Sequence, residues 1–527
     1  MELLLVKPPE FTVPGTSRTR IHGAVVLPIG ILHLGSYVRN KLEGLEVSYL
    51  DLHLKCKQDL KSQGCIGSLF ELMERHLKET FSQNKAPVVG ITCAINEFAD
   101  NLHHTAKLIK EFNPGAIVIV GGHYVSSYQE RALKDENIDY IFIGEGELPL
   151  MKFLQSFKEK RLPKEEIIDE MVYIQDFNSF PLLDYDRLDI EGYFDFEMNS
   201  VGGDEGRTLN LVTSRGCPCK CTFCSTHNVW DYGYRAQTAG NIFKQVKDLK
   251  EKYAVDTIIF VEDNFVLDKN RVKEFCHFLL DSKINVKWYP SSVMVNALDQ
   301  GTVRLMAQAG CKSLGIAIET GVPRVQKLIK KNVDLVHAKE IIQCMKEEKM
   351  MVRGLFVIGF AGETREDIEQ TIEYAKELEC DWNLFHMASP LYGSEMYKLC
   401  EENGYLPCDG KINTFVGGQA AIETPEFKPA DIEGIMQEAN YRLNYLENPN
   451  YMAGRYENIM PIYENIARIY TDHFVSKYMI WRVYKETQQD EKASGIYDNL
   501  KDLYKSNIDK NRELITKYNL DISFELN

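Results

Sequence analysis

Four cysteines lie within eight residues of one another in the middle of the chain, and three of them have a spacing that could do chemistry. Cys217, Cys221 and Cys224 have the spacing C-x3-C-x2-C. Thiolates this close together can hold three corners of a cubane [4Fe–4S] cluster, which usually has four cysteine ligands. A cluster held at three corners keeps one iron open to an exogenous ligand. The spacing therefore indicates a cluster that does chemistry rather than one that only transfers electrons.

Zinc binding and disulfide bonding are the alternative uses of this motif. A structural zinc site needs a fourth ligand, usually from a second Cys/His pair. Cys219, inside the motif, does not supply that pair, and His227 is the nearby candidate. An odd total of 13 cysteines and no secretory signal favour a reducing compartment over disulfides. The remaining cysteines are widely spaced and are expected mostly as small core residues: Cys56, Cys65, Cys93, Cys276, Cys311, Cys344, Cys380, Cys400 and Cys408.

The segment Ser214-Arg-Gly-Cys217-Pro-Cys-Lys-Cys221-Thr-Phe-Cys224 resembles the signature of the radical S-adenosylmethionine (SAM) superfamily. In that family the amino and carboxylate groups of SAM chelate the open iron. An electron from the cluster then cleaves the sulfonium and yields a 5′-deoxyadenosyl radical. The resemblance implies that Cys217, Cys221 and Cys224 hold the cluster and that Phe223 packs near the adenine.

Downstream of the cysteines, short apolar runs alternate with helical stretches. Apolar runs between amphipathic helices are typical of buried parallel strands. The alternation predicts a parallel barrel or part-barrel, with active residues at the carboxyl ends of its strands. The expected strands are 256–264, 286–292, 313–321, 352–360 and 381–387, and the expected helices are 270–281, 300–309, 324–330, 337–348 and 364–379.

Several of these strand ends resemble SAM-binding segments of the superfamily. Glu262 and Asp263 follow the second barrel strand, where relatives hold the SAM amino group. Glu319 resembles the Glu of a Glu-Ser-Gly segment near the SAM ribose, and Gly359 opens a turn like the family's Gly-Leu-Pro-Gly-Glu-Thr. Many relatives have an arginine after the third strand, but none occurs within 291–295. Glu363-Thr364 could equally be the acidic start of a helix.

The first 150 residues predict a separate doubly wound α/β domain. Strands are expected at 3–9, 45–51, 88–93, 116–122 and 140–144, with helices such as 31–42 and 100–111 between them. Such domains bind ligands beyond the carboxyl ends of their strands. Glycines at two of these ends, Gly121-Gly122 and Gly144, would let a ligand approach the backbone closely, or could simply form turns.

This half resembles the cobalamin (B12)-binding domain fused to one class of radical SAM enzymes. The matching segments are Lys7-Pro-Pro9, Leu34-Gly35, Gly121-Gly-His123 and Gly144-Glu-Gly-Glu147. The resemblance implies that the nucleotide tail of cobalamin is cradled by Thr92, Ala94, Gly121, Gly122, His123, Gly144 and Glu145.

One further match is incomplete. Asp51-Leu-His53 looks like the start of the Asp-x-His-x-x-Gly motif that ligates cobalt, but it lacks the glycine and follows the second strand instead of the first. We therefore expect no protein histidine on cobalt, and we expect His123 to contact the corrin or a loop.

Composition favours a cytoplasmic enzyme. The chain has 527 residues, 44% of them hydrophobic, which is enough core for two to three domains. No apolar stretch is long enough to span a membrane. The net charge of −16 disfavours a generic nucleic-acid binder. The expected partners are a small-molecule substrate and a reductant such as flavodoxin or ferredoxin, and the oligomeric state stays open.

The predicted fold is therefore α/β in three parts. Residues 1–155 form a Rossmann-like cobalamin-binding domain and 156–205 a linker. Residues 206–425 form a radical SAM partial (β/α)6 TIM-type barrel. Residues 426–527 form a mostly helical domain that shapes the substrate site, and its many tyrosines are expected to serve packing.

The resemblance implies an enzyme with a [4Fe–4S] cluster, SAM and cobalamin that methylates an unactivated carbon. Two alternatives remain open at this point. One is a radical SAM enzyme that cyclises or rearranges its substrate, for example a tetrapyrrole. The other is a non-catalytic cobalamin-binding protein with a degenerate barrel, against which the intact three-cysteine motif argues.

Overall fold

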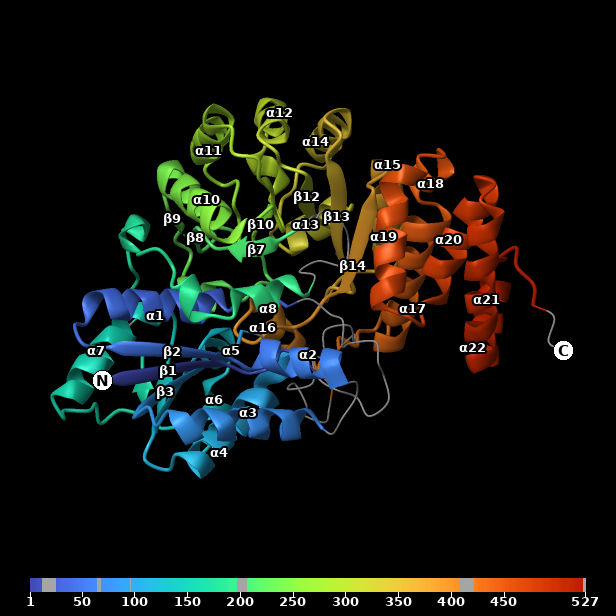
Figure 1. Cartoon of the computed structure of the whole chain (residues 1–527). Helices are drawn as coiled ribbons and strands as arrows, with labels where there is room; N and C mark the ends of the chain where they lie inside the picture. The colour runs from blue at the N-terminus through green and yellow to red at the C-terminus, as the bar shows by residue number, and fades with distance from the viewer. Residues whose placement is uncertain are drawn as a thin grey trace.

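The computed structural model describes residues 1–11, 25–63, 68–94, 96–169, 171–196, 206–407 and 421–524. A parallel sheet with its helices forms the lower part of the molecule in Figure 1, and a second set of parallel strands lies above it. C-terminal helices stand at the side of the upper unit. Cys65 and Cys408 lie outside the described residues. Within the described ranges no helix is long and apolar enough to cross a membrane.

The N-terminal unit is a six-stranded parallel sheet in the order β2-β1-β3-β4-β5-β6. Its strands are apolar on both faces because helices cover both, as parallel sheets require. Leu3 and Leu5 of β1 pack toward α1 and α7, whereas Leu4 and Val6 pack toward α2, α3 and α4. The strands are β1 Glu2–Lys7, β2 Glu46–Asp51, β3 Val88–Thr92, β4 Ile117–Gly121, β5 Tyr140–Phe142 and β6 Ile167–Ile168. The helices are α1 Ile29–Lys41, α2 Leu52–Gln63, α3 Leu69–Gln83, α4 Ala99–Phe112, α5 His123–Ser127, α6 Gln129–Leu133 and α7 Glu147–Lys158. The predicted doubly wound sheet is confirmed.

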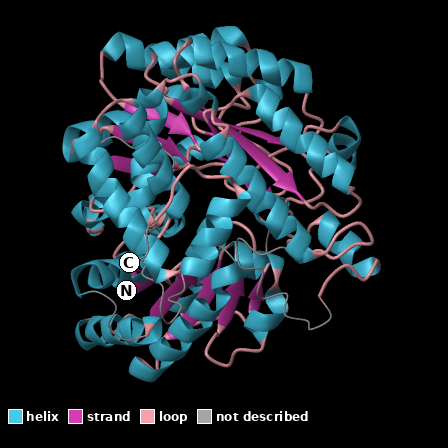
Figure 2. Cartoon of the chain, turned by 90° about the vertical axis from the view of Figure 1, so that its right-hand side faces the viewer, coloured by secondary structure: helices cyan, strands magenta, loops and turns pink. Residues whose placement is uncertain are grey.

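The upper unit is a six-stranded part-barrel. Three strands form one parallel sheet in the order β11-β10-β7 and three form another in the order β12-β13-β14. Bridges from Trp288 to Cys311 and from Val293 to Ile316 join the two sheets, so the strands follow one another in chain order. Figure 2 shows helices outside these strands. The strands are β7 Thr208–Leu211, β10 Thr257–Phe260, β11 Lys287–Pro290, β12 Ser313–Glu319, β13 Met351–Ile358 and β14 Trp382–Met387. The helices are α10 Ala239–Tyr253, α11 Lys269–Ser282, α12 Gln300–Gln308, α13 Pro323–Leu328, α14 Leu335–Glu347, α15 Arg365–Leu378 and α16 Glu395–Glu402.

The connection between the units is short and largely irregular. Its elements are η3 Phe177–Ser179, η4 Tyr185–Arg187 and α8 Ile190–Phe194. Phe177 and Phe180 pack on the His33 ring of α1 and lie below the guanidinium of Arg215. A two-stranded antiparallel ribbon, β8 Ser214–Arg215 with β9 Arg235–Ala236, flanks the cysteine segment and the short helix α9 His227–Trp230.

The C-terminal helices cover the edge strand β14. An uncovered strand edge exposes unpaired backbone groups that invite aggregation. Asn444 replaces a neighbouring strand there: its side-chain oxygen accepts from the Asn383 amide at 2.7 Å and its side-chain nitrogen donates to the Asn383 carbonyl at 2.7 Å. Trp382 packs on Tyr445 in a tyrosine-rich core. The elements are α17 Pro429–Tyr441, the π-helical η7 Arg442–Leu446, α18 Pro449–Met452, α19 Tyr456–Ile469, α20 Phe474–Glu486, α21 Asp490–Ser506 and α22 Ile508–Lys517.

A buried ionic network holds the lower sheet against the barrel. Arg215 of β8 pairs with Glu145 and, at 2.7 Å, with Glu147, and Arg235 of β9 pairs with Glu145 at 2.7 Å. All four side chains are less than 10% exposed. Arg215 is further enclosed by Trp230, whose ring centroid lies 4.9 Å from the guanidinium carbon. Both glutamates belong to the Gly-Glu-Gly-Glu segment, and Arg215 belongs to the cysteine signature. The ion pairs therefore join two of the sequence motifs directly.

We predict that Glu145→Gln lowers the free energy of unfolding by roughly 3–5 kcal/mol, because it leaves the buried Arg235 without its carboxylate partner and Arg215 with Glu147 alone. Urea denaturation of the purified chain, followed by circular dichroism, measures the loss. Glu46→Gln is the control: Glu46 pairs with Arg187 on the surface, where an ion pair contributes about 0–1 kcal/mol. Equal midpoints for the two variants would show that the network does not hold the units together.

Candidate functional site

The four cysteines of the signature line one pocket at the carboxyl end of the barrel. The segment that carries them runs between β8 and α9, and residues after β10, β11 and β12 complete the walls. The cavity measures about 110 Å³. Its lining residues are Cys217, Cys219, Cys221, Phe223, Cys224, Thr226, His227, Asp263, Asn264, Ser292, Met294, Ala317 and Lys331.

The thiols suit a cluster better than a single ion. Among the described residues, no three His, Cys, Asp or Glu side chains converge closely enough to ligate one metal ion. A cubane differs because each cysteine binds a different iron, so its ligands stand farther apart. Burial raises the pKa of Cys221 to about 11. A hydrogen bond between Cys217 and Cys219 lowers the pKa of Cys219 to about 7 and raises that of Cys217. Because thiolates are the ligands, metal must displace these protons.

Lys331 is the cation of this pocket, and sequence reasoning missed it. Its buried ammonium pairs with Glu319 at 2.7 Å, and the nearby thiols of Cys221 and Cys219 help to raise its pKa against the opposing effect of burial. Lys331 stands in a tight turn after α13, flanked by Lys330 and Asn332 with left-handed backbone. No periodic pattern marks such a residue.

Two polar side chains that follow β10 line the same cavity. Asn264 is 2% exposed and its side-chain oxygen has no hydrogen-bond partner in the part of the chain that the structure describes. Asp263 accepts from the Gly216 amide at 3.0 Å, and burial raises its pKa. The acceptor oxygens of Asp263 and Asn264 suit the amino group of an amino-acid ligand, and the Lys331 ammonium suits its carboxylate. The pocket therefore fits the methionyl part of SAM beside the cluster.

The remaining residues predicted to bind SAM lie in different surroundings. Phe223 lines the pocket, and its ring centroid lies 5.4 Å from that of Phe360. Glu262 is outside the lining: its carboxylate accepts from the Ser214 amide at 2.6 Å and pairs with Arg271 at 3.2 Å. Glu319 reaches the pocket only through Lys331.

Gly359 also lies outside the lining of the cluster pocket and has a different role. Its φ of 85° requires the left-handed region, and a Cβ there would meet Ile432 of α17 at 3.1 Å. Glu363 accepts from the amides of Gly359 and Phe360 at 2.7 and 3.0 Å, and burial raises its pKa to about 7. Thr364 caps α15 through a capping box with Asp367. The turn therefore ends the strand and starts the helix.

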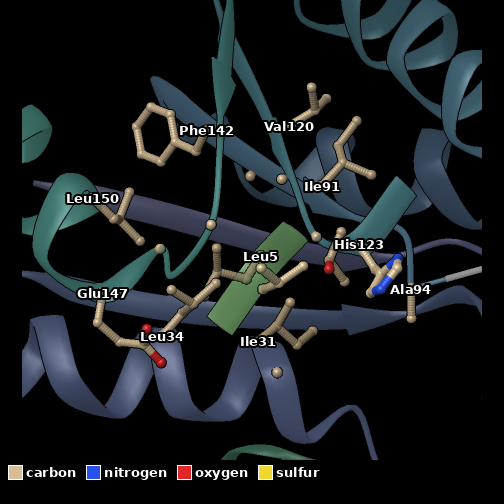
Figure 3. Close-up of a pocket in the computed structure, with 18 of the residues that line it drawn as sticks. Leu5, Ile31, Leu34, Ile91, Ala94, Val120, His123, Phe142, Glu147 and Leu150 are labelled. Atoms are coloured by element: carbon tan, nitrogen blue, oxygen red, sulfur yellow. The ribbon is translucent and has the colours of Figure 1, made fainter. Parts of the chain in front are cut away.

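A second, apolar pocket of about 330 Å³ lies between the lower sheet and helices α1 and α7. In Figure 3 Ile31 and Leu34 rise from α1 toward Leu5, while His123 and Ala94 lie together away from Phe142 and Leu150. Six of the seven residues predicted to bind cobalamin line it: Thr92, Ala94, Gly121, Gly122, His123 and Gly144. Glu145 does not line the pocket, whereas Glu147 and Arg215 of the same ionic network do.

The pocket fits the nucleotide tail of cobalamin. Aliphatic side chains and glycines form walls suited to a flat, uncharged base, and few side chains occupy the space. Gly122 has a φ of 103°, and a Cβ there would meet the Cys93 carbonyl oxygen at 2.6 Å. Val229 and Trp230 of α9 also line the cavity, so the barrel supplies part of its wall.

His123 lies between the two pockets. Its ring nitrogens are 3.4 Å from the hydroxyls of Ser127 and Ser225, and Ser225 directly follows the cluster cysteine Cys224. Burial lowers the pKa of His123, which favours the neutral ring. His53 is elsewhere: it accepts from the Glu10 amide at 3.0 Å and packs against Phe11.

Comparisons with known proteins match a known family to each of the two segments that form the pockets. The profile of the radical SAM superfamily matches residues 211–375, and that of the B12 binding domain matches residues 22–154. The two matches cover the cysteine signature with its barrel and the sheet with its apolar pocket. The chain belongs to the B12-binding radical SAM enzymes, whose cofactors are a [4Fe–4S] cluster, SAM and cobalamin.

Curated relatives include methyltransferases and a cyclase. The cytidylyl-2-hydroxyethylphosphonate methyltransferase of Streptomyces wedmorensis is 28% identical over 64% of this chain and 71% of its own length. An uncharacterized methyltransferase of Pyrococcus horikoshii is 26% identical over 77% and 84%. The anaerobic magnesium-protoporphyrin IX monomethyl ester cyclase of Rubrivivax gelatinosus is 23% identical over 68% and 65%.

Two solved structures share the fold along nearly the whole chain. The cobalamin-dependent SAM radical enzyme OxsB superposes with a TM-score of 0.64 at 13% identity, covering 99% of this chain and 82% of that one. The radical SAM methyltransferase TsrM of Kitasatospora setae superposes with a TM-score of 0.60 at 14% identity, covering 96% and 99%. At these identities the likeness is one of fold.

We predict that Gly122→Ala reduces hydroxocobalamin binding at least tenfold. The new Cβ would press on the Cys93 carbonyl, and the left-handed backbone disfavours alanine. Gly115→Ala is the control, since Gly115 does not line the pocket and a Cβ there meets no atom within 4 Å. Absorbance titration with hydroxocobalamin measures both affinities. Equal affinities of the two variants would mean that cobalamin does not bind beside Gly122.

We predict that Lys331→Met weakens SAM binding roughly 10- to 100-fold, the effect of losing a hydrogen bond between charged groups. Lys330→Met should leave the affinity unchanged, because Lys330 pairs with the exposed Glu395 instead. Equilibrium dialysis of cluster-loaded protein measures the affinities, and iron analysis checks that both variants keep the cluster. Unchanged SAM affinity in Lys331→Met would remove Lys331 from the SAM site.

Proposed function

We propose that this enzyme transfers a methyl group to an unactivated carbon of a small molecule. The observation that carries the proposal is the shared wall of the two cofactor pockets: α9, directly after the cysteine segment, contributes Val229 and Trp230 to the apolar pocket. A cobalamin bound there would meet the open side of the cluster pocket. The methyltransferase names of two relatives support this reaction over cyclisation.

When bound, the three cofactors supply the electron, the hydrogen-atom abstraction and the methyl group of such a reaction. The chain supplies position and exclusion of water. Lys331 and Asn264 would orient SAM, with Phe223 beside its adenine. Holding reactants in the right geometry contributes large rate factors, and a closed site protects reactive species from solvent. The cofactors carry the difficult chemistry.

The acidic surface is consistent with the partners that we propose. A net charge of −16 suits a small-molecule substrate better than a nucleic acid. Electrons would come from a protein such as flavodoxin or ferredoxin. The helices from α17 onward would close the side of the barrel and shape the substrate site.

We predict that protein reconstituted with iron, sulfide and hydroxocobalamin, and supplied with reduced flavodoxin, transfers a trideuteromethyl group from labelled SAM to a compound in a metabolite extract. Mass spectrometry would show a product heavier by one trideuterated methyl unit, together with 5′-deoxyadenosine.

Cys221→Ala should lose iron and both products, whereas Cys344→Ala, far from the motif and buried between α12 and α14, should keep them. 5′-Deoxyadenosine with a product lighter by hydrogen or water would instead indicate cyclisation. 5′-Deoxyadenosine without bound cobalamin would exclude methyl transfer from cobalamin.

A further inference from the structure

One face of β14 is turned into the barrel lumen. In the parallel register Arg353, Leu355 and Val357 of β13 lie beside Trp382, Leu384 and His386 of β14, and paired residues share a face. The Arg353 side chain reaches past the neighbouring strand β12 to β11. Its Nε donates to the Ser313 hydroxyl of β12 at 3.1 Å, and its guanidinium carbon lies 5.2 Å from the ring centroid of Tyr289 on β11. His386 therefore points inward, near the carboxyl end of the last strand.

This part of the lumen is open to solvent. Leu355, Val357 and Leu384 are half-buried and His386 is exposed, whereas Phe356 and Phe385 on the opposite face are buried and stacked at 5.0 Å. Barrel interiors are normally filled by side chains. Leu384 also packs against the tyrosine-rich C-terminal core. We call the exposed part of the inward face around His386, together with Leu355 and Val357 of β13, the chamber.

The chamber lies next to the cluster pocket. Ala317 of β12 lines that pocket and lies beside Leu355 in the sheet. Glu319, at the end of β12, is near enough to raise the pKa of His386, but the surrounding walls have the larger, opposite effect. The ring is therefore neutral at pH 7, with one donor and one acceptor nitrogen. Within the described ranges, neither ring nitrogen makes a hydrogen bond to another residue.

We propose that His386 is the specificity-determining residue of the substrate chamber and that it binds a neutral oxygen, a hydroxyl above all, on a mainly apolar small molecule. The inference deepens the proposed function by naming the substrate class of the same site. Leu355 and Val357 would hold the apolar part. A neutral ring beside Glu319, whose charge Lys331 already compensates, offers no cation to a carboxylate.

A matched set of probes tests this without turnover. The four compounds share a phenyl frame and differ in one group: 2-phenylethanol, phenylacetate, phenethylamine and ethylbenzene. Binding is measured by ligand-observed NMR to protein loaded with cluster, hydroxocobalamin and SAM, with no reductant present. The variants are His386→Ala, His386→Gln, which keeps hydrogen-bonding groups, and His277→Ala, a control on the exposed face of α11. Iron content and SAM affinity confirm that each variant is intact.

In wild-type protein 2-phenylethanol should bind roughly three- to tenfold more tightly than ethylbenzene, because one net hydrogen bond contributes about that factor in affinity. It should also bind more tightly than the two charged compounds. His386→Ala should abolish this preference, His386→Gln should retain part of it, and His277→Ala should leave it unchanged. Absence of a preference in the wild type, or its persistence in His386→Ala, would overturn the proposal. Because no methyl transfer is measured, either result is independent of whether the proposed reaction is correct.

Discussion

The structure depends on one buried ionic contact between its two α/β units. Burying four charged side chains is costly unless each is paired, and here Arg215 pairs with Glu145 and Glu147 while Arg235 pairs with Glu145. Arg215 stands two residues before the first cluster cysteine, and Glu145 lies in the loop beside the apolar pocket. The contact therefore fixes the cysteine segment relative to the lower sheet, and Glu147 and Arg215 also line the apolar pocket.

With that relation fixed, the two pockets share their walls. Trp230 lines the apolar pocket and also covers Arg215, while His123 joins Ser127 of the lower unit to Ser225 of the cysteine segment. Cofactors held on separate mobile domains would have to find one another at each turnover. Here the same short segment carries the signature cysteines and, through Val229 and Trp230, part of the wall of the apolar pocket, so their relative geometry is set on folding.

Features that depend on local sequence patterns were mostly predicted, whereas contacts between residues far apart in the chain mostly were not. Cysteine spacing, apolar runs and glycines identified the signature, both sheets and six of the residues that line the apolar pocket. Glu145 was predicted to bind cobalamin, but the structure holds it in ion pairs with Arg215 and Arg235, which lie 70 and 90 residues away in the chain. Lys331 was missed because a single lysine in an irregular turn has no periodicity to reveal it. Glu262 was given a ligand role, since a strand-end carboxylate has the same sequence pattern whether it faces a pocket or a backbone amide.

Among the described strands β14 pairs with β13 alone, so the barrel does not close along this strand and the C-terminal helices cover it. Asn444 satisfies the backbone of that edge at Asn383, and Trp382 anchors the tyrosine core at the base of the same strand. His386, at the carboxyl end of β14, is exposed. In the function that we propose, the C-terminal helices would limit how much of the lumen is accessible to a substrate.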